Sequence, residues 1–184
     1  MTPGTASPSD EQLARDIRAA IRDVPDFPKP GILFKDITPV LQDALLFRRT
    51  CEALAAPWRS SRITHVLAIE SRGFIFGAPV ALALGASFVP LRKPGKLPHE
   101  TVRETYALEY GTDALEVHRD ALGSGARVLI VDDLLATGGT AAAAVRLAER
   151  LGGSVCGISV VVGLDFLPWG ETLKGRRAEV LVRF

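Results

Sequence analysis

The sequence contains little that would staple, tether or strongly charge a protein. Only two of its 184 residues are cysteines, Cys51 and Cys156, and they share no metal-type spacing. Each lies in an apolar stretch, so we expect two free, buried thiols in a reducing compartment rather than a disulfide or a metal site. A chain of this length can bury a core without either kind of staple.

Long apolar runs and charge of one sign are also missing. No apolar run approaches the roughly 20 residues that span a bilayer. The opening stretch MTPGTASPSD lacks the basic start and the apolar stretch of a signal peptide. We therefore expect a cytoplasmic protein without a membrane partner. The formal charge of +1 gives no argument for a nucleic-acid partner.

The Pro, Gly, Ser and Thr content of the opening stretch predicts a short disordered tail over residues 1–8, and the length of the chain predicts a single domain over residues 9–184. Five segments are typical of strands: THVLAIE, ASFVPLRK, RVLIVDD, SVCGISVVVGLD and AEVLVRF. Helical stretches follow the first and third of them. Strands that alternate with helices predict an α/β fold with a mainly parallel central sheet flanked by helices.

Two segments fit neither pattern. The stretch VPDFPKPGILFKDITPVL holds too many prolines for a helix, and we interpret it as an ordered loop that carries apolar groups towards something. The stretch PGKLPHETVRETYALEYGT is polar and is interpreted as a long loop. Both segments would then lie outside the central sheet.

In an α/β fold, ligands bind at the carboxyl ends of the strands. The stretch RVLIVDDLLATGGT combines such a strand end with a Gly-Gly step before a helix. Gly138 and Gly139 let the backbone approach a ligand closely, and Thr137 and Thr140 offer hydroxyl donors. The free N–H groups at the start of the next helix favour an anion. These features suit a terminal phosphate.

Two carboxylates stand in the same stretch. Asp132 and Asp133 would repel a phosphate that lay against them. They make sense if the ligand carries a vicinal diol several ångströms from its phosphate, because carboxylates accept hydrogen bonds from both hydroxyls. The alternative is that the two residues only cap a turn, with Gly-Gly as an ordinary connector.

Two further strand ends carry polar and basic residues. They are Ser71 and Arg72 before a helix-opening glycine, and Arg92, Lys93 and Lys96 around a Pro-Gly turn. A single surface arginine and a solvated basic turn are the plainer interpretations. Taken with the diol site, two anion sites indicate a sugar with phosphates at both ends.

The stretch VLIVDDLLATGGT resembles the phosphoribosyl pyrophosphate signature of the type I phosphoribosyltransferases. Four more blocks, FPKPGILFKDITPVL, ESRGFIFG, LRKPGKLP and YALEYG, are similar to those of the adenine phosphoribosyltransferases and follow the same order. The resemblance runs from about Pro25 to Gly163 and fades after Asp165. It implies the type I phosphoribosyltransferase fold, with a small hood over about residues 24–40, a flexible lid loop over about residues 93–112, and a homodimer.

The resemblance implies purine salvage by an enzyme of class EC 2.4.2.7, which converts adenine and 5-phospho-α-D-ribose 1-diphosphate into AMP and diphosphate. Mg²⁺ would be held mainly through substrate and water, with no direct protein ligand. The 5-phosphate would lie at Ala136, Thr137, Gly138, Gly139 and Thr140, and the ribose hydroxyls at Asp132 and Asp133. The diphosphate would lie at Ser71, Arg72, Arg92, Lys93 and Lys96.

The resemblance also assigns the catalytic and base-binding groups. Arg72, Lys96 and Glu109 would be catalytic, with Glu109 managing the proton at purine N7 and Tyr110 in the lid. Adenine would lie against Leu33, Phe34 and Lys35. A cis peptide is expected between Glu70 and Ser71.

Three other functions share part of this pattern. A phosphoribosyltransferase for hypoxanthine, guanine, xanthine or orotate would keep the phosphate and diol sites, but the block FPKPGILFKDITP speaks against it. A non-catalytic sensor of phosphoribosyl pyrophosphate would tolerate loss of Arg72, Lys96 or Glu109, all of which are present. A structural nucleotide-binding module explains neither the basic turn nor the lid.

Overall fold

The computed structural model describes residues 8–107 and 111–184. These residues divide after Ala53 into two compact units, each of which is described by itself. The tail predicted over residues 1–8 lies outside the described residues except for Pro8, where the first helix begins. In the described part of the chain, no helix is both long enough and apolar enough to cross a membrane.

The first unit consists of helices and one small antiparallel sheet. Its elements are α1 (Pro8–Ala20), β1 (Arg22–Pro25), β2 (Leu33–Asp36), α2 (Thr38–Gln42) and α3 (Ala44–Ala55), whose last two residues belong to the second unit. The Pro-rich segment predicted to be a loop therefore contains the end of β1, all of β2 and most of α2, and the loop prediction is wrong for these elements. Positive φ angles at Asp26 (58°) and Gly31 (86°) mark the turn that joins β1 and β2 into a hairpin.

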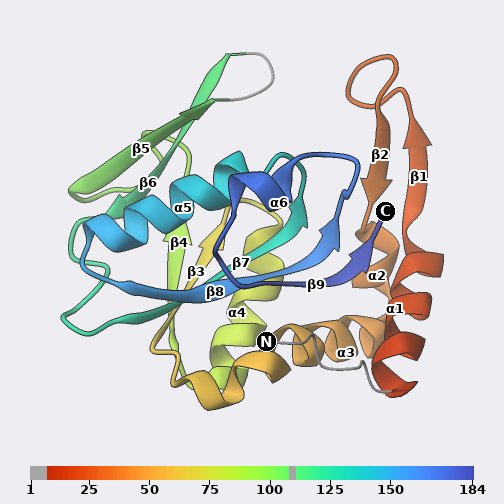
Figure 1. Cartoon of the computed structure of the whole chain (residues 1–184), viewed down its shortest axis with the longest axis horizontal. Coiled ribbons are helices and arrows are strands. Elements are labelled where there is room, and N and C mark those ends of the chain that lie inside the picture. Colours follow the sequence, from red (N-terminus) through yellow and green to blue (C-terminus); the bar gives the residue numbers. More distant parts are fainter. Residues whose placement is uncertain (1–7, 108–110) are drawn as a thin grey trace. The chain divides into compact units, whose positions relative to one another are not determined.

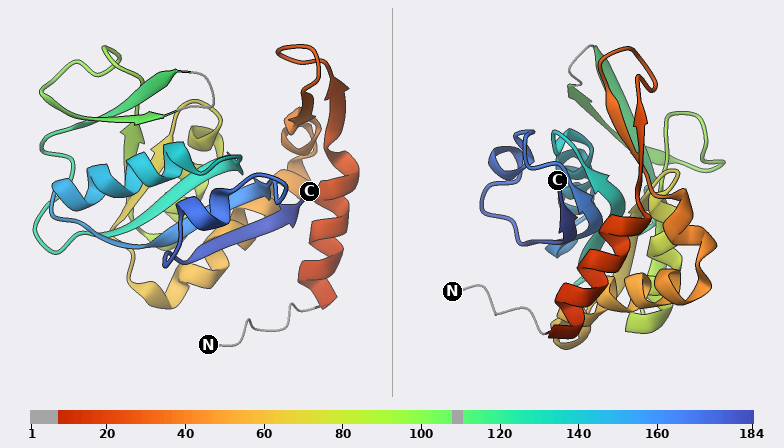
Figure 2. Two further views of the ribbon diagram at one scale, coloured as in Figure 1. Left: turned by 45° about the horizontal axis from the view of Figure 1, so that its top comes forward. Right: turned by 90° about the vertical axis from the view of Figure 1, so that its right-hand side faces the viewer.

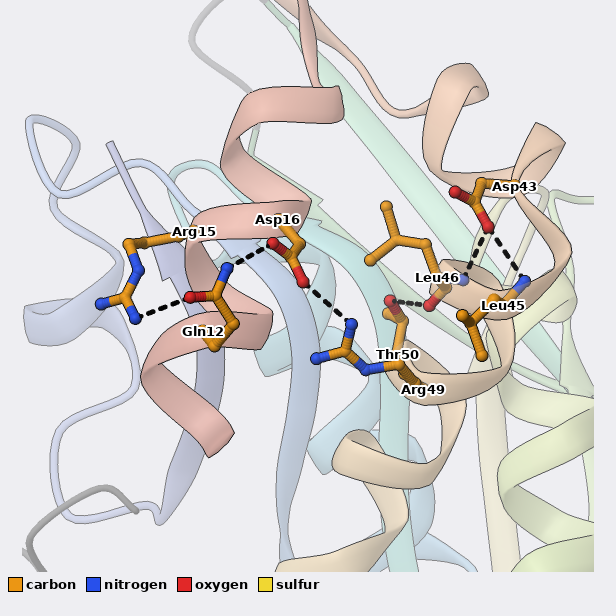
Figure 3. A network of polar contacts seen from close by, with 8 residues as sticks. All are labelled: Gln12, Arg15, Asp16, Asp43, Leu45, Leu46, Arg49 and Thr50. Carbon is orange, nitrogen blue, oxygen red and sulfur yellow. Dashed lines mark hydrogen bonds and ion pairs between the residues drawn. The ribbon is translucent and has the colours of Figure 1, made fainter. Parts of the chain in front are cut away.

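Polar contacts join the helices of the first unit, as Figure 3 shows. Arg49 Nη1 in α3 lies 2.8 Å from Asp16 Oδ2 in α1. Asp43 precedes α3, and its Oδ1 accepts the N–H groups of Leu45 and Leu46 at 2.9 Å each. This cap satisfies two backbone donors that the first turn of a helix otherwise leaves open.

The second unit contains a five-stranded sheet in the order β4-β3-β7-β8-β9. All four neighbouring pairs are parallel, which confirms the predicted parallel sheet. The unit's strands are β3 (His65–Ile69), β4 (Ser87–Leu91), β5 (Thr101–Ala107), β6 (Thr112–His118), β7 (Arg127–Leu135), β8 (Ser154–Gly163) and β9 (Ala178–Arg183). Its other helices are the 3₁₀ helix Ala56–Ser61, α4 (Gly73–Leu84), α5 (Gly139–Arg150) and α6 (Trp169–Thr172).

The order of the strands creates a switch point between β3 and β7. From β3 the chain passes through α4 to β4 on one side, and from β7 it passes through α5 to β8 on the other. Right-handed crossovers in opposite directions place α4 and α5 on opposite faces of the sheet, and α5 lies in front of the strands in Figure 1. A ligand crevice is expected outside the carboxyl ends of the two strands at such a point.

The core of the second unit lies between this sheet and its helices. The side chains Leu67, Ile130 and Ile158 of the three central strands are buried. Central parallel strands are buried on both faces, which explains their nearly continuous apolar sequences. In α5, the small residues Ala143 and Ala144 are also buried and let the helix approach the strands closely.

The segment Thr101–Ala107 is a strand rather than part of a long loop, so the loop prediction is wrong there. It pairs antiparallel with β6, and the two strands stand beside α5 in the left view of Figure 2. Val102, Glu104 and Tyr106 alternate on its less exposed face. The charged Glu104 interrupts the apolar alternation that would have indicated a strand.

Glu104 is tolerated on that face because α5 supplies two arginines. Arg146 Nε lies 2.5 Å from Glu104 Oε1, and Arg150 Nη1 lies 2.9 Å from Glu104 Oε2. These contacts lower the pKa of Glu104. The hairpin of β5 and β6 is thereby fastened to the helix that follows the Gly-Gly loop.

Both cysteines are free, as predicted. Cys51 is buried, and burial raises the pKa of its thiol to about 12. Cys156 is only half-buried, so the prediction of a buried thiol is wrong for it. Cys156 lies near the start of β8, where the burial of that strand is still incomplete.

Candidate active site

The register of the sheet brings two of the predicted site segments together. Ala68 in β3 pairs with Val131 in β7, so the residues after β3 lie beside the carboxylates of β7. Arg72 Nε lies 2.8 Å from Asp133 Oδ2, and the side chain of Asp133 is 8% exposed. The contact is an ion pair without hydrogen-bond alignment, and Asp133 Oδ2 accepts no hydrogen bond from any described residue. Arg72 is thus a charge partner for a buried carboxylate that keeps an open acceptor.

Asp132 lies against the first residue of α4. A Cβ on Gly73 would stand 2.8 Å from Asp132 Oδ1, so glycine is what permits this approach. The same oxygen accepts the N–H of Asp133 at 2.9 Å. Burial, followed by the neighbouring Asp133 carboxylate, raises the pKa of Asp132 well above its usual range. Two ionised carboxylates side by side in this position are therefore unfavourable without a further partner.

The ATGGT stretch forms the connection from β7 to α5. Gly138 has φ +80° and precedes the first residue of the helix, Gly139. A Cβ on Gly138 would lie 3.2 Å from both Trp169 Cα and Thr172 Cβ, so α6 packs closely against this loop. The first N–H groups of α5 have no partner within the helix and can bind an anion.

The peptide between Glu70 and Ser71 is cis, as the resemblance implies. Glu70 Oε2 accepts a hydrogen bond from Arg92 Nε at 2.5 Å. Burial alone would raise the pKa of Glu70, but the Arg92 guanidinium, the Lys93 backbone N–H and the Lys96 charge outweigh it and lower the pKa. The cations of the Pro-Gly turn therefore lie close to the segment that carries Ser71.

Lys93 points into the hairpin rather than standing free. Its Nζ donates to Tyr106 Oη at 2.8 Å and forms a very close ion pair with Asp113. Burial alone would lower the pKa of Lys93, but the hydrogen bonds to Asp113 and Tyr106 raise it overall. Lys96 is exposed, whereas Arg92 is partly buried.

The residues predicted to bind adenine lie in the first unit, on β2. Lys35 Nζ is 2.6 Å from Asp23 Oδ1 across the hairpin, which fixes the side chain of Lys35. The rings of Phe34 and Phe27 pack edge to face with centroids 5.0 Å apart. Leu33 is half exposed.

Known proteins with similar sequences identify the family to which this site belongs. The model of the phosphoribosyl transferase domain matches residues 41–166, more than half of the chain. A curated adenine phosphoribosyltransferase of Myxococcus xanthus is 55% identical over 184 residues, which cover 100% of this chain and 100% of the relative. The chain belongs to the adenine phosphoribosyltransferase family. The predicted function, a phosphoribosyl transfer to adenine in purine salvage, and the enzyme class EC 2.4.2.7 are thereby confirmed.

Solved adenine phosphoribosyltransferases share the fold. The structure from Rhodothermus marinus has a TM-score of 0.90 at 49% identity and covers 95% of this chain and 99% of its own. The structure from Saccharomyces cerevisiae, in complex with D-2,5-dideoxy-2,5-imino-altritol 1,6-bisphosphate and adenine, has a TM-score of 0.85 at 40% identity and covers 92% and 97%. The predicted type I phosphoribosyltransferase fold is confirmed.

Two residues of the predicted site are not described by the structure, and two residues that contact the site were not predicted. Glu109 and Tyr110 lie outside the described residues. Sequence reasoning missed Asp113 and Glu116, which contact the basic turn from β6. Glu116 is itself buried between apolar neighbours, whereas Asp113 lies near the exposed start of the strand, so the burial pattern of β6 does not single out these two residues.

Proposed function

We propose that the edge of the sheet at the carboxyl ends of β3 and β7 holds phosphoribosyl pyrophosphate, while adenine N9 attacks the anomeric carbon. The ion pair between Arg72 and Asp133 carries the proposal. It shows that one edge presents a cation and a carboxylate side by side at the switch point of the sheet. A ligand that offers hydroxyls and phosphates within a few ångströms satisfies both groups.

The two carboxylates accept hydrogen bonds from the ribose hydroxyls. Asp133 Oδ2 has an acceptor position that no described residue fills, and a hydroxyl can fill it. Ionised Asp132 provides the second acceptor. The 5-phosphate binds across Ala136, Thr137, Gly138, Gly139 and Thr140, where the start of α5 supplies N–H donors.

The diphosphate binds Ser71, Arg72, Arg92 and Lys96. Fixed cations at the leaving group stabilise the charge that develops as its bond to the anomeric carbon breaks. Lys93 joins this group by exchanging Asp113 for the diphosphate. Arg72 and Lys96 are therefore the proposed catalytic cations.

Adenine stacks on Phe34, and backbone groups at Leu33 and Lys35 pair with its N6 and N1. A 6-oxopurine reverses this donor and acceptor pattern, and each polar group left unpaired costs about 1–3 kcal/mol. Glu109 approaches N7 and manages its proton, while Tyr110 and the loop around it close over the substrates. Closure excludes water from the reacting carbon.

Mg²⁺ is the cofactor we propose. Hard cations prefer oxygen ligands, and the two carboxylates at the end of β7 would suit a hydrated Mg²⁺. Asp133 Oδ2 accepts no hydrogen bond from a described residue, so it would be able to hold the hydrated ion through a water or a ribose hydroxyl. The ion would neutralise charge on the diphosphate. We also propose a homodimer in the cytoplasm, because the chain belongs to the adenine phosphoribosyltransferase family.

The ligands named for the yeast relative support this arrangement. That protein was solved with adenine and with a ligand that carries phosphates at positions 1 and 6. At 40% identity over 92% of this chain, a sugar-like ligand with two phosphate ends is a reasonable guide to the substrate here.

One assay tests the function. The chain is given phosphoribosyl pyrophosphate and Mg²⁺, and pyrophosphate release is compared for adenine, hypoxanthine, guanine and orotate. We expect turnover with adenine and little with the other three bases. Absence of turnover with adenine, or faster turnover with hypoxanthine, would reject the proposed base.

A further inference from the structure

Glu116 in β6 is an acidic residue in a buried position. Among the described carboxylates, Asp133 and Glu116 have the lowest exposure, with residue values of 6% and 9%. Its neighbours Leu115 and Val117 are fully buried apolar residues. A buried carboxylate is unfavourable unless polar partners compensate it, so its partners show what it is there to hold.

Outside the ladder of β5 and β6, the hydrogen bonds of Glu116 among the described residues lead to the basic turn. Its backbone exchanges two hydrogen bonds with Arg92: the Glu116 N–H donates to Arg92 O at 2.7 Å, and the Arg92 N–H donates to Glu116 O at 2.9 Å. Its side chain reaches further along the turn, where Oε2 accepts the N–H of Gly95 at 3.0 Å. One residue thus holds the turn at both ends.

The turn matters because of the residues it carries. Arg92 continues from its bridge with Glu116 to the carboxylate of Glu70, next to Ser71. Lys96 directly follows Gly95, which has φ +75° and so fixes an unusual direction of the chain at that point. The Lys96 charge also contributes to the lowered pKa of Glu70. The position of the Gly95 backbone therefore sets where the Lys96 side chain leaves the turn.

We infer that Glu116 is a positioning residue for diphosphate binding, which acts by holding the N–H of Gly95 so that Lys96 faces the diphosphate. This inference rests on the role proposed above for Lys96. Glu116 itself does not touch the substrate. Its carboxylate fixes the geometry of a flexible cation, which raises affinity for the leaving group without adding a contact.

The test measures the affinity of the full chain for inorganic pyrophosphate with Mg²⁺ by calorimetry, together with the KM values for both substrates. Glu116→Ala should weaken pyrophosphate binding by up to about 100-fold, the order of loss that a displaced group can cause. The KM for phosphoribosyl pyrophosphate should rise, and the KM for adenine should stay unchanged. Glu116→Gln, whose amide oxygen can accept the same N–H, should restore most of the affinity.

Two controls separate positioning from loss of structure. Glu104→Gln loosens the same hairpin from α5 and should lower the melting temperature without changing pyrophosphate affinity. Glu116→Asp keeps the charge but falls short of Gly95 by one methylene, and it carries the test if the alanine variant does not fold. Loss of affinity in Glu104→Gln equal to that in Glu116→Ala would overturn the inference.

A double-mutant cycle with Lys96 decides the mechanism. If Glu116 acts through Lys96, adding Glu116→Ala to Lys96→Ala should cause no further loss of pyrophosphate affinity. Equal losses in the two backgrounds would overturn the positioning role while leaving the role of Lys96 intact. A Lys96→Ala variant with unchanged affinity would instead reject the proposed role of Lys96, and the inference would fall with it.

Discussion

Arg72 Nε lies 2.8 Å from Asp133 Oδ2 and joins the segment after β3 to the end of β7. The pair places a cation proposed for the diphosphate in contact with a carboxylate proposed for the ribose. Each residue therefore has a partner before substrate arrives, which limits the cost of holding Asp133 in a nearly buried position.

Removal of Arg72 should reduce stability and activity by separable routes. Arg72→Ala leaves Asp133 without its cation, at about 1–3 kcal/mol in the free energy of unfolding. It should also lower kcat by about 100-fold or more, as loss of a charge-stabilising donor does. Denaturant unfolding and steady-state kinetics measure the two effects. The double variant Arg72→Ala with Asp133→Ala should recover stability but not activity; additive losses of stability would contradict the pairing.

Asp132→Asn should stabilise the chain at neutral pH and inactivate it. The folded state raises the pKa of Asp132, so it favours the protonated carboxyl and is destabilised as pH rises above the ordinary value near 4. The neutral amide removes that penalty and can still accept the N–H of Asp133. We expect a gain of about 2–4 °C in melting temperature, equivalent to about 1 kcal/mol. A lower melting temperature than wild type at pH 7 would refute the raised pKa.

Glu70→Gln should show a loss of stability that depends on pH in the opposite sense. The pKa of Glu70 is lowered in the folded state, chiefly by Arg92 working against burial. The stabilisation is therefore present above the ordinary glutamate pKa, about 4.3, and disappears as pH falls through the lower folded value. Wild type should exceed the variant in melting temperature at pH 7, and the difference should shrink towards pH 3. A constant difference between pH 3 and pH 7 would rule out the ion pair as its cause.

Gly73→Ala tests the close approach of α4 to Asp132. Its Cβ would stand 2.8 Å from Asp132 Oδ1 and 3.1 Å from Val131 O, so one side must move. We expect a rise in KM for phosphoribosyl pyrophosphate of about 10-fold or more, since reacting groups tolerate little displacement. Gly170→Ala is the matched control, because a Cβ there would meet no atom within 4 Å beyond its chain neighbours and the backbone of its own helix. Equal kinetics in the two variants would show that Asp132 does not need this approach.

The central strands were predictable because their sequences are dictated by burial on two faces. THVLAIE and RVLIVDD are apolar enough that no other element fits them. The hairpin of β5 and β6 was not predictable in the same way. Glu104 belongs to its inner face only because Arg146 and Arg150 neutralise it from α5, and no local pattern announces partners more than 40 residues away.

The candidate site shows the same division. The phosphate site at Gly138 and Gly139 could be predicted locally, since the loop and the helix that form it are adjacent in sequence. The pairing of Arg72 with Asp133 depends on the register of β3 and β7, which the sequence does not encode over any short stretch. The acidic residues Asp113 and Glu116 were missed for the same reason. Their role depends on contacts with the basic turn, which is distant in sequence.

A crystal structure of the chain with phosphoribosyl pyrophosphate and Mg²⁺ tests the account most directly. We predict electron density for ribose hydroxyls against Asp132 and Asp133, for the 5-phosphate at the start of α5, and for the diphosphate near Arg72. A 5-phosphate bound elsewhere than the start of α5, or ribose hydroxyls without contact to either carboxylate, would contradict the account.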